Sequence, residues 1–196
     1  MGPSDEELVA AFQRGELDAF DTLILRWDGK IRGAIYRILG SEDEARDLCQ
    51  EAFLRAYRAL PGFKGQARFS SWLYQIALNL CRDRMRRRRG RVFVSLDDAD
   101  QPGHQKVDPG PSTLDLVESQ DLSRAVADAI ADLPEEQRVV IVLKEYQDLT
   151  FLEISETLDV PLSTVKTRLY RGLTQLRESL ERRGVRGAAV VPAPTA

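Results

Sequence analysis

Apolar residues recur every three or four positions over most of the chain, which is the spacing of one face of an α-helix. The first such segment covers about residues 5–39 and begins with acidic residues. Its two internal glycines, Gly15 and Gly29, are possible breaks, since glycine weakens a helix interior. Gly40 ends the pattern, so the sequence predicts a helical N-terminal segment with one or two interruptions.

The next segment, about residues 41–60, has two distinct faces. Ser41 followed by Glu44 predicts a capped helix start, and a Pro-Gly pair after Leu60 predicts its end. Small and apolar side chains share one face, at Leu48, Ala52 and Ala56. A second face, spaced i, i+3, i+4 and i+7, is mostly polar and consists of Asp47, Gln50, Glu51 and Leu54.

A polar loop leads into an apolar helical pattern that starts near Phe69 and runs into a block of arginines. From Arg82 to Arg91 there are seven Arg and one Asp. Such a block is either a flexible basic tail or a helix end that binds phosphates. We favour the second, because the arginines continue a well-formed helical pattern.

The composition then changes to Gly, Pro and Asp over about residues 95–115, with no surviving period. We interpret this stretch as a linker, and residues 97–121 carry a net charge of −6. A second helical pattern begins near Glu118. Its VVIVL run, at 139–143, can be a buried strand or a helix, and the flanking helix-start signals favour a helix.

The last folded segment predicts two short helices joined by a tight corner. Thr150 and Glu153 form a T-x-x-E capping box. Asp159 lies where the chain must turn, and aspartate tolerates left-handed geometry better than most residues. Ser163 is the expected N-cap of the second helix.

The second helix of this pair is amphipathic, with a basic outer face. Its buried stripe is expected to contain Val165, Leu169, Leu173, Leu176 and Leu180. The opposite face carries Thr164, Thr167 and Arg171, flanked by Lys166, Arg168 and Tyr170. Residues 163–186 have a net charge of +5 within a chain of −3. This is either a solvated basic face or a helix-turn-helix whose second helix enters a DNA major groove.

Several functional classes are disfavoured by composition. The chain has two cysteines, which we expect to be buried reduced thiols, and one histidine, so neither a metal site nor any other cofactor is expected. No catalytic motif is recognisable, and an enzyme is not expected. The sequence shows neither a membrane-spanning run nor a signal peptide, so we expect a cytoplasmic protein.

Four motifs, in this order and at these separations, resemble a bacterial RNA polymerase sigma factor of the sigma-70 family, of the compact extracytoplasmic-function (ECF) type. They are DLCQEAFLRAYRAL, FSSWLYQIALNLCRDRMRR, LPEEQRVVIVL and EISETLDVPLSTVKTRLYRGL. The resemblance covers residues 17–183. Asp159 stands where the family usually has Gly, and Ser155 where it usually has Ala.

The resemblance implies an all-α chain of two small helical domains joined by a flexible acidic linker. The expected boundaries are 1–91 for sigma region 2, 92–117 for the linker, 118–184 for region 4 and 185–196 for a disordered tail. It also implies the partners: core RNA polymerase, through the β′ clamp helices and the β subunit, promoter DNA, and an anti-sigma factor.

The resemblance, considered together with the chemistry of the residues, implies three groups of site residues. Core polymerase would be bound by Asp47, Gln50, Glu51 and Leu54. Unpaired bases and phosphates of the −10 element would be held by Lys64, Arg68, Asn79, Arg82, Arg84 and Arg86. The −35 element would be contacted by Thr164, Lys166, Thr167, Arg168, Tyr170 and Arg171. For Trp72 and Tyr74 core packing is the favoured role, with strand separation an alternative for Trp72.

Two other classes remain as alternatives. A helix-turn-helix regulator that does not act as a sigma subunit would explain the second domain. It would not explain the function of the helices around Leu48 and Trp72. An anti-sigma factor or other interaction protein would not need two separate basic faces.

Overall fold

The protein is described by a computed structural model that covers residues 2–92 and 114–185. Every regular element in these residues is helical, which confirms the predicted all-α class. The helices of the first half are α1 (Asp5–Gln13), α2 (Asp18–Leu39), α3 (Glu42–Ala59), the short 3₁₀ turn η1 (Leu60–Gly62) and α4 (Phe69–Val92). Those of the second half are α5 (Leu114–Ala131), α6 (Glu135–Ile141), the π-helical turn η2 (Val142–Tyr146), α7 (Phe151–Leu158) and α8 (Leu162–Arg182).

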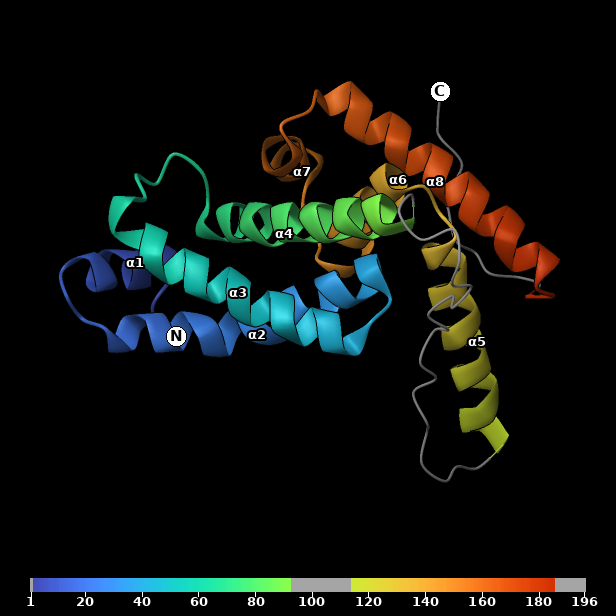
Figure 1. Cartoon of the computed structure of the whole chain (residues 1–196), viewed down its shortest axis with the longest axis horizontal. Coiled ribbons are helices and arrows are strands. Elements are labelled where there is room, and N and C mark those ends of the chain that lie inside the picture. Colours follow the sequence, from blue (N-terminus) through green and yellow to red (C-terminus); the bar gives the residue numbers. More distant parts are fainter. Residues whose placement is uncertain (1, 93–113, 186–196) are drawn as a thin grey trace.

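In the first half, α2, α3 and α4 pack side by side and α1 lies against α2 (Figure 1). Their shared core consists of fully buried apolar side chains, among them Leu23, Ile31, Ile35, Ile38 and Leu73. The small face predicted for the helix after Gly40 is buried in α3 as expected. Small residues there let α2 and α4 approach α3 closely, so three long helices share one core.

The second half is built around α6. Its VVIVL run is helical, as predicted, and all five side chains are buried. A segment buried on all sides has no amphipathic period, which is why a strand and a helix could not be distinguished by pattern alone. The π-helical turn η2, which begins at Val142 in this run and ends at Tyr146, was not predicted.

Helices α7 and α8 form the predicted helix-turn-helix. Thr150 caps α7 in a reciprocal capping box with Glu153. Asp159 is left-handed, with φ 52°, as expected for the corner. The predicted start of α8 is wrong by two residues: the N-cap is Pro161, and Ser163 already lies in the first turn. Proline fits there because it needs no backbone hydrogen-bond partner at a helix start.

The predicted breaks in the N-terminal segment are half right. Gly15 has φ 100° and separates α1 from α2. Gly29 does not interrupt α2, because tertiary packing on both sides of it outweighs the weak helix preference of one glycine.

The expected linker and tail fall largely outside the described residues, which exclude 93–113 and 186–196. Helix α4 extends to Val92 and α5 begins at Leu114, so helical structure reaches into both ends of the predicted linker. The domain boundaries therefore stay predictions. No helix in the described ranges is long and apolar enough to cross a membrane.

Candidate polymerase and nucleic-acid interfaces

Helix α8 presents the predicted outer face to solvent. Thr167, Tyr170 and Arg171 are exposed, whereas Val165 and Leu169 on the opposite side are buried. The stripe continues along the helix through Leu173, Leu176 and Leu180. One side of the helix is therefore fixed on α6 and α7, and the other is available to a partner.

The residues that flank this face differ from one another. Lys166 is exposed, with its ammonium 5.8 Å from the centroid of the Phe151 ring. Arg168 turns back to the protein, where its Nη2 lies 2.8 Å from Glu136 Oε2, and only 23% of its side chain is exposed. Thr164 is half-buried. Of the six predicted residues, Thr167, Tyr170, Arg171 and Lys166 form the accessible set.

The arginine-rich end of α4 is helical, and it divides the predicted −10 residues between two sides. Asn79, Arg82 and Arg86 lie at i, i+3 and i+7 on one exposed face. Arg82 Nη1 donates to Asn79 Oδ1 at 3.1 Å, which orients the amide. Arg84 lies on another side of the helix, 3.3 Å from Glu44 Oε1 of α3.

Glu44 was predicted only as part of the helix-start signal with Ser41, and its ion contacts with α4 could not be predicted from the sequence. Its carboxylate accepts from Arg84 and, through the second oxygen, from Arg88. Ser41 caps α3 by accepting from the Glu44 backbone N–H, but the Glu44 side chain is used by the arginines. The pair of ion contacts ties the basic end of α4 to the start of α3, 40 residues away in the chain.

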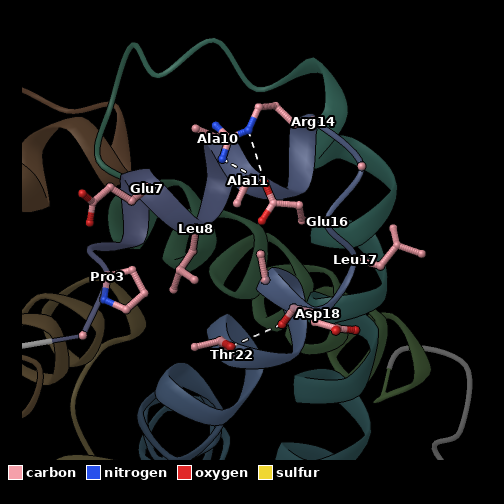
Figure 2. A pocket seen from close by; sticks show the side chains of 13 residues that line it. Pro3, Glu7, Leu8, Ala10, Ala11, Arg14, Glu16, Leu17, Asp18 and Thr22 are labelled. Carbon is pink, nitrogen blue, oxygen red and sulfur yellow. Dashed lines mark hydrogen bonds and ion pairs between the residues drawn. The ribbon is translucent and has the colours of Figure 1, made fainter.

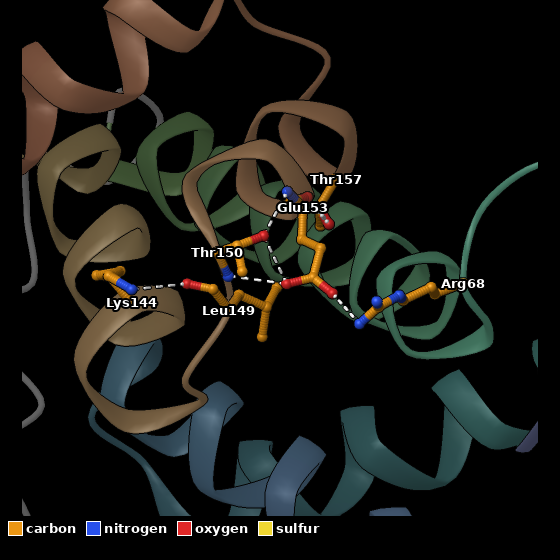
Figure 3. Close-up of polar contacts among 6 residues, drawn as sticks. All are labelled: Arg68, Lys144, Leu149, Thr150, Glu153 and Thr157. Atoms are coloured by element: carbon orange, nitrogen blue, oxygen red, sulfur yellow. Dashed lines mark hydrogen bonds and ion pairs between the residues drawn. The ribbon is translucent and has the colours of Figure 1, made fainter. Parts of the chain in front are cut away.

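The loop before α4 carries the other two predicted −10 residues. Lys64 is exposed, and Arg68 Nη1 lies 2.7 Å from Glu153 Oε1 at the start of α7 (Figure 3). The other Glu153 oxygen accepts from the Thr150 backbone and hydroxyl at 2.8 and 2.7 Å. These hydrogen bonds, together with the charge of Arg68, hold the pKa of Glu153 below its ordinary value of 4.5.

Further contacts join the two halves in addition to this ion pair. The Tyr74 hydroxyl donates to Gln147 Oε1 at 2.6 Å, and burial raises the pKa of this phenol above its usual value. Arg138 Nη1 donates to the Ile38 carbonyl at 2.6 Å. The favoured core role of Tyr74 is consistent with its 1% exposure. The hydrogen bond to Gln147 was not predictable, because its partner lies 73 residues away.

Trp72 is half-buried at the start of α4. Its ring centroid lies 4.8 Å from that of Phe63 in the preceding loop and 5.9 Å from that of Phe69. The residue therefore packs on the loop and is partly buried, and its alternative role in strand separation stays a prediction.

On α3, the predicted polymerase-binding residues form one exposed strip. Asp47 and Gln50 are exposed, and Leu54 is an exposed large apolar residue at 46%. Glu51 is half-buried and accepts from Arg55 Nε at 2.8 Å. The strip thus combines an acidic group, an amide and apolar area on a rigid helix.

Both cysteines are buried, at 1% exposure each, and neither is in a disulfide. Burial raises the pKa of each thiol to about 12. Cys49 Sγ also lies 3.5 Å from Asp28 Oδ1, and this carboxylate favours the protonated thiol further. Both groups are therefore protonated at neutral pH and chemically inert, as the sequence predicts for structural thiols.

A broad hollow lies between α1 and the start of α2 (Figure 2). Its lining mixes small apolar side chains with the exposed ion pair of Arg14 and Glu16, 3.0 Å apart. Within the described ranges, no cluster of His, Cys, Asp and Glu has the arrangement of a metal site.

Models of two protein families match the chain in the order of its two halves. Sigma-70 region 2 matches residues 23–91, and Sigma-70, region 4 matches residues 123–176. The ECF RNA polymerase sigma factor SigW of Bacillus subtilis is 40% identical over 88% of this chain and 94% of its own length. The ECF RNA polymerase sigma-E factor of Escherichia coli is 35% identical over 86% of this chain and 90% of its own.

Solved structures show the same fold. CnrH, in complex with the cytosolic domain of CnrY, superposes with a TM-score of 0.69 at 24% identity, over 92% of this chain and 99% of that one. The sigma factor RpoE of Bartonella quintana, in complex with the anti-sigma factor NepR, gives a TM-score of 0.68 at 22% identity, over 83% and 96% of the two chains.

Proposed function

This chain belongs to the extracytoplasmic-function sigma factors of the sigma-70 family. On that basis we propose which of its exposed faces binds core polymerase and which bind the two promoter elements. The chain is a sigma subunit that binds core RNA polymerase, directs it to specific promoters and helps to open the −10 region. The observation that carries this function is the presence of both halves, region 2 and region 4, in one chain. A regulator with a helix-turn-helix alone would have no use for the first half.

The −35 element is assigned to α8. Its exposed Thr167, Tyr170 and Arg171 suit base edges in the major groove, where the planar guanidinium can bind O6 and N7 of one guanine together. Lys166 stands at the border of this face and suits a phosphate. Arg168 is given a supporting role here, because its ion pair with Glu136 holds α8 to α6.

The −10 element is assigned to the loop before α4 and to one face of that helix. Reading a base in an opened strand needs a pocket beside an aromatic surface and cations along the backbone. Trp72 offers the partly accessible ring, Asn79 the polar group, and Lys64, Arg82 and Arg86 the charges. Arg84 contributes through Glu44 to the orientation of this helix end.

Reading both elements at once requires a change from the arrangement described above. The −10 and −35 elements lie about 25 base pairs apart, or roughly 85 Å at 3.4 Å per step. Helix α8 spans only about 32 Å at 1.5 Å per residue, and α7 packs directly against α4. The two halves must therefore separate, which breaks the contact of Arg68 with Glu153 and releases this arginine for the −10 phosphates.

Three further statements rest on the family. We propose that the chain catalyses no reaction itself, since nucleotidyl transfer belongs to the polymerase, and that it acts in the cytoplasm. RpoE of Bartonella quintana was solved with the anti-sigma factor NepR, and we propose an anti-sigma partner for this chain as well.

The α3 strip is the proposed docking site for the β′ clamp helices of core polymerase, and a double substitution tests it. Asp47→Ala with Glu51→Ala should weaken core binding about tenfold, because both side chains face a basic partner in the proposed complex. Most of the loss should come from Asp47, since Glu51 is partly neutralised by Arg55. Helix content by circular dichroism should not change.

The matched control replaces two exposed acids of α8, Glu178→Ala with Glu181→Ala, which changes the net charge equally. Titration of labelled protein with core polymerase compares the three chains. Equal affinity of the wild type and the α3 double variant would move the polymerase contact away from α3.

A further inference from the structure

Helix α1 lies before residue 23, where the match to region 2 begins, so the family match gives it no role. The structure nevertheless holds this helix at both ends. At its N-terminal end the Asp5 carboxylate accepts from Trp27 Nε1 at 3.0 Å and from the Arg26 guanidinium. At its C-terminal end the contacts come from Gln13.

The Gln13 side chain binds the start of the loop before α4. Its Nε2 donates to the Leu60 carbonyl at 3.0 Å and to the Phe63 carbonyl at 2.8 Å. These two carbonyls belong to the two ends of the η1 turn, from which the loop departs. Both amide hydrogens of Gln13 are thus used on backbone positions 47 and 50 residues away.

The fixed end of the loop determines where its functional side chains lie. Phe63, whose carbonyl Gln13 binds, packs against Trp72 with 4.8 Å between ring centroids and the ring planes tilted by 41°. Lys64 follows directly, and Gly65, at φ 66°, then turns the chain toward α4. A shift of the Phe63 backbone would therefore move the aromatic surface and the cation together.

We propose that Gln13 is a positioning residue for −10 recognition and that α1 braces the loop that captures the opened strand. The inference rests on the proposed function of this loop. Gln13 is exposed, and the buried Leu60 carbonyl also accepts from the Phe63 backbone N–H at 3.1 Å, so it keeps a partner when Gln13 is replaced and the fold should remain. The affected quantity is preorganisation: a loop that samples several conformations binds its strand less tightly and discriminates bases less sharply.

The test uses holoenzyme assembled from core polymerase and the full chain. Its binding to a fluorescent single-stranded oligonucleotide is measured. The oligonucleotide carries the non-template −10 sequence that the wild-type chain selects. Two variants are compared: Gln13→Ala, and Gln13→Glu, which has the same size but cannot donate. Each should bind the oligonucleotide about tenfold less tightly, because the loss of two neutral hydrogen bonds can account for a change of this size. Both should also lose part of the preference for the cognate base. Core affinity and the thermal midpoint should change little.

Arg14→Ala is the matched control. This residue lies next to Gln13 at the same helix end, and its guanidinium forms an exposed ion pair with Glu16 at 3.0 Å (Figure 2). It should leave −10 binding and base preference unchanged. Unaltered −10 affinity and base preference in both Gln13 variants, or an equal loss in Arg14→Ala, would overturn the proposal. If the wild-type chain binds core but the resulting holoenzyme binds no −10 oligonucleotide, the assignment of the loop is refuted instead.

Discussion

Gly172 lies where α8 crosses α6, and its replacement tests how closely α8 packs on α6. A Cβ atom at this position would come 2.8 Å from Ile141 Cδ1 and 3.1 Å from Gln137 Cβ. Ile141 is 1% exposed and has no room to move, and the Cβ of Gln137 is fixed to the backbone. Overpacking of this kind costs about 1–3 kcal/mol. Alanine regains about 1 kcal/mol of helix propensity, so Gly172→Ala should destabilise by about 1 kcal/mol.

Gly29 supplies the matched control within the same chain. It also lies inside a helix, but a Cβ there meets nothing within 4 Å. Gly29→Ala should therefore stabilise by up to about 1 kcal/mol, from propensity alone. Urea unfolding followed by circular dichroism measures both variants. If Gly172→Ala stabilises the protein as much as Gly29→Ala does, the close approach of α8 to α6 is refuted.

Three other predictions concern the DNA face, the thiols and the contact between the halves. Arg171→Ala should cost about 1–3 kcal/mol of binding free energy on the preferred −35 duplex and reduce discrimination at one base pair. Lys166→Ala should weaken binding to all duplexes alike and reduce the slope of log affinity against log salt concentration by about one. Identical base preferences in both variants would make Arg171 a phosphate contact. Cys81→Ser should lower the free energy of unfolding by about 1 kcal/mol, because it places a hydroxyl in an apolar site. In the wild type, the Cys81 thiol should resist alkylation until urea unfolds the chain. Rapid labelling of the native protein would contradict the burial of this thiol. The lowered pKa of Glu153 stabilises the fold above pH 4.5, and this contribution is lost as the pH falls from 4.5 through the lower folded-state value. Below pH 4.5 the stability of Glu153→Gln should therefore depend less on pH than that of the wild type. An unchanged dependence in that range would show that the carboxylate contributes no stability.

Local patterns were sufficient for most of the helices. The capping box at Thr150, the left-handed corner at Asp159 and the buried stripe of α8 each depend on residues within one or two turns. Such short-range chemistry is present in the sequence itself. One error was local, since Pro161 took the capping position expected for Ser163. The other was not, because tertiary packing outweighed the weak helix preference of Gly29.

Contacts between distant segments could not be predicted in the same way. The family resemblance implies that Arg68 and Arg84 lie near DNA, which stays a prediction. It does not show that Glu153 and Glu44 bind them, because these partners lie 85 and 40 residues away. The two carbonyls that Gln13 binds carry no sequence signal at all, since every residue has a carbonyl. The accessible part of each predicted site therefore became clear only from the packed structure.

The central claim is that this chain directs core RNA polymerase to promoters, and run-off transcription tests it most directly. Core polymerase is mixed with the full chain and a library of templates that vary the −35 and −10 sequences. The account predicts discrete run-off transcripts from a defined subset of templates, none with core alone, and fewer with the α3 variant Asp47→Ala, Glu51→Ala. Failure of the chain to associate with core, or transcription that is the same with and without it, would contradict the account.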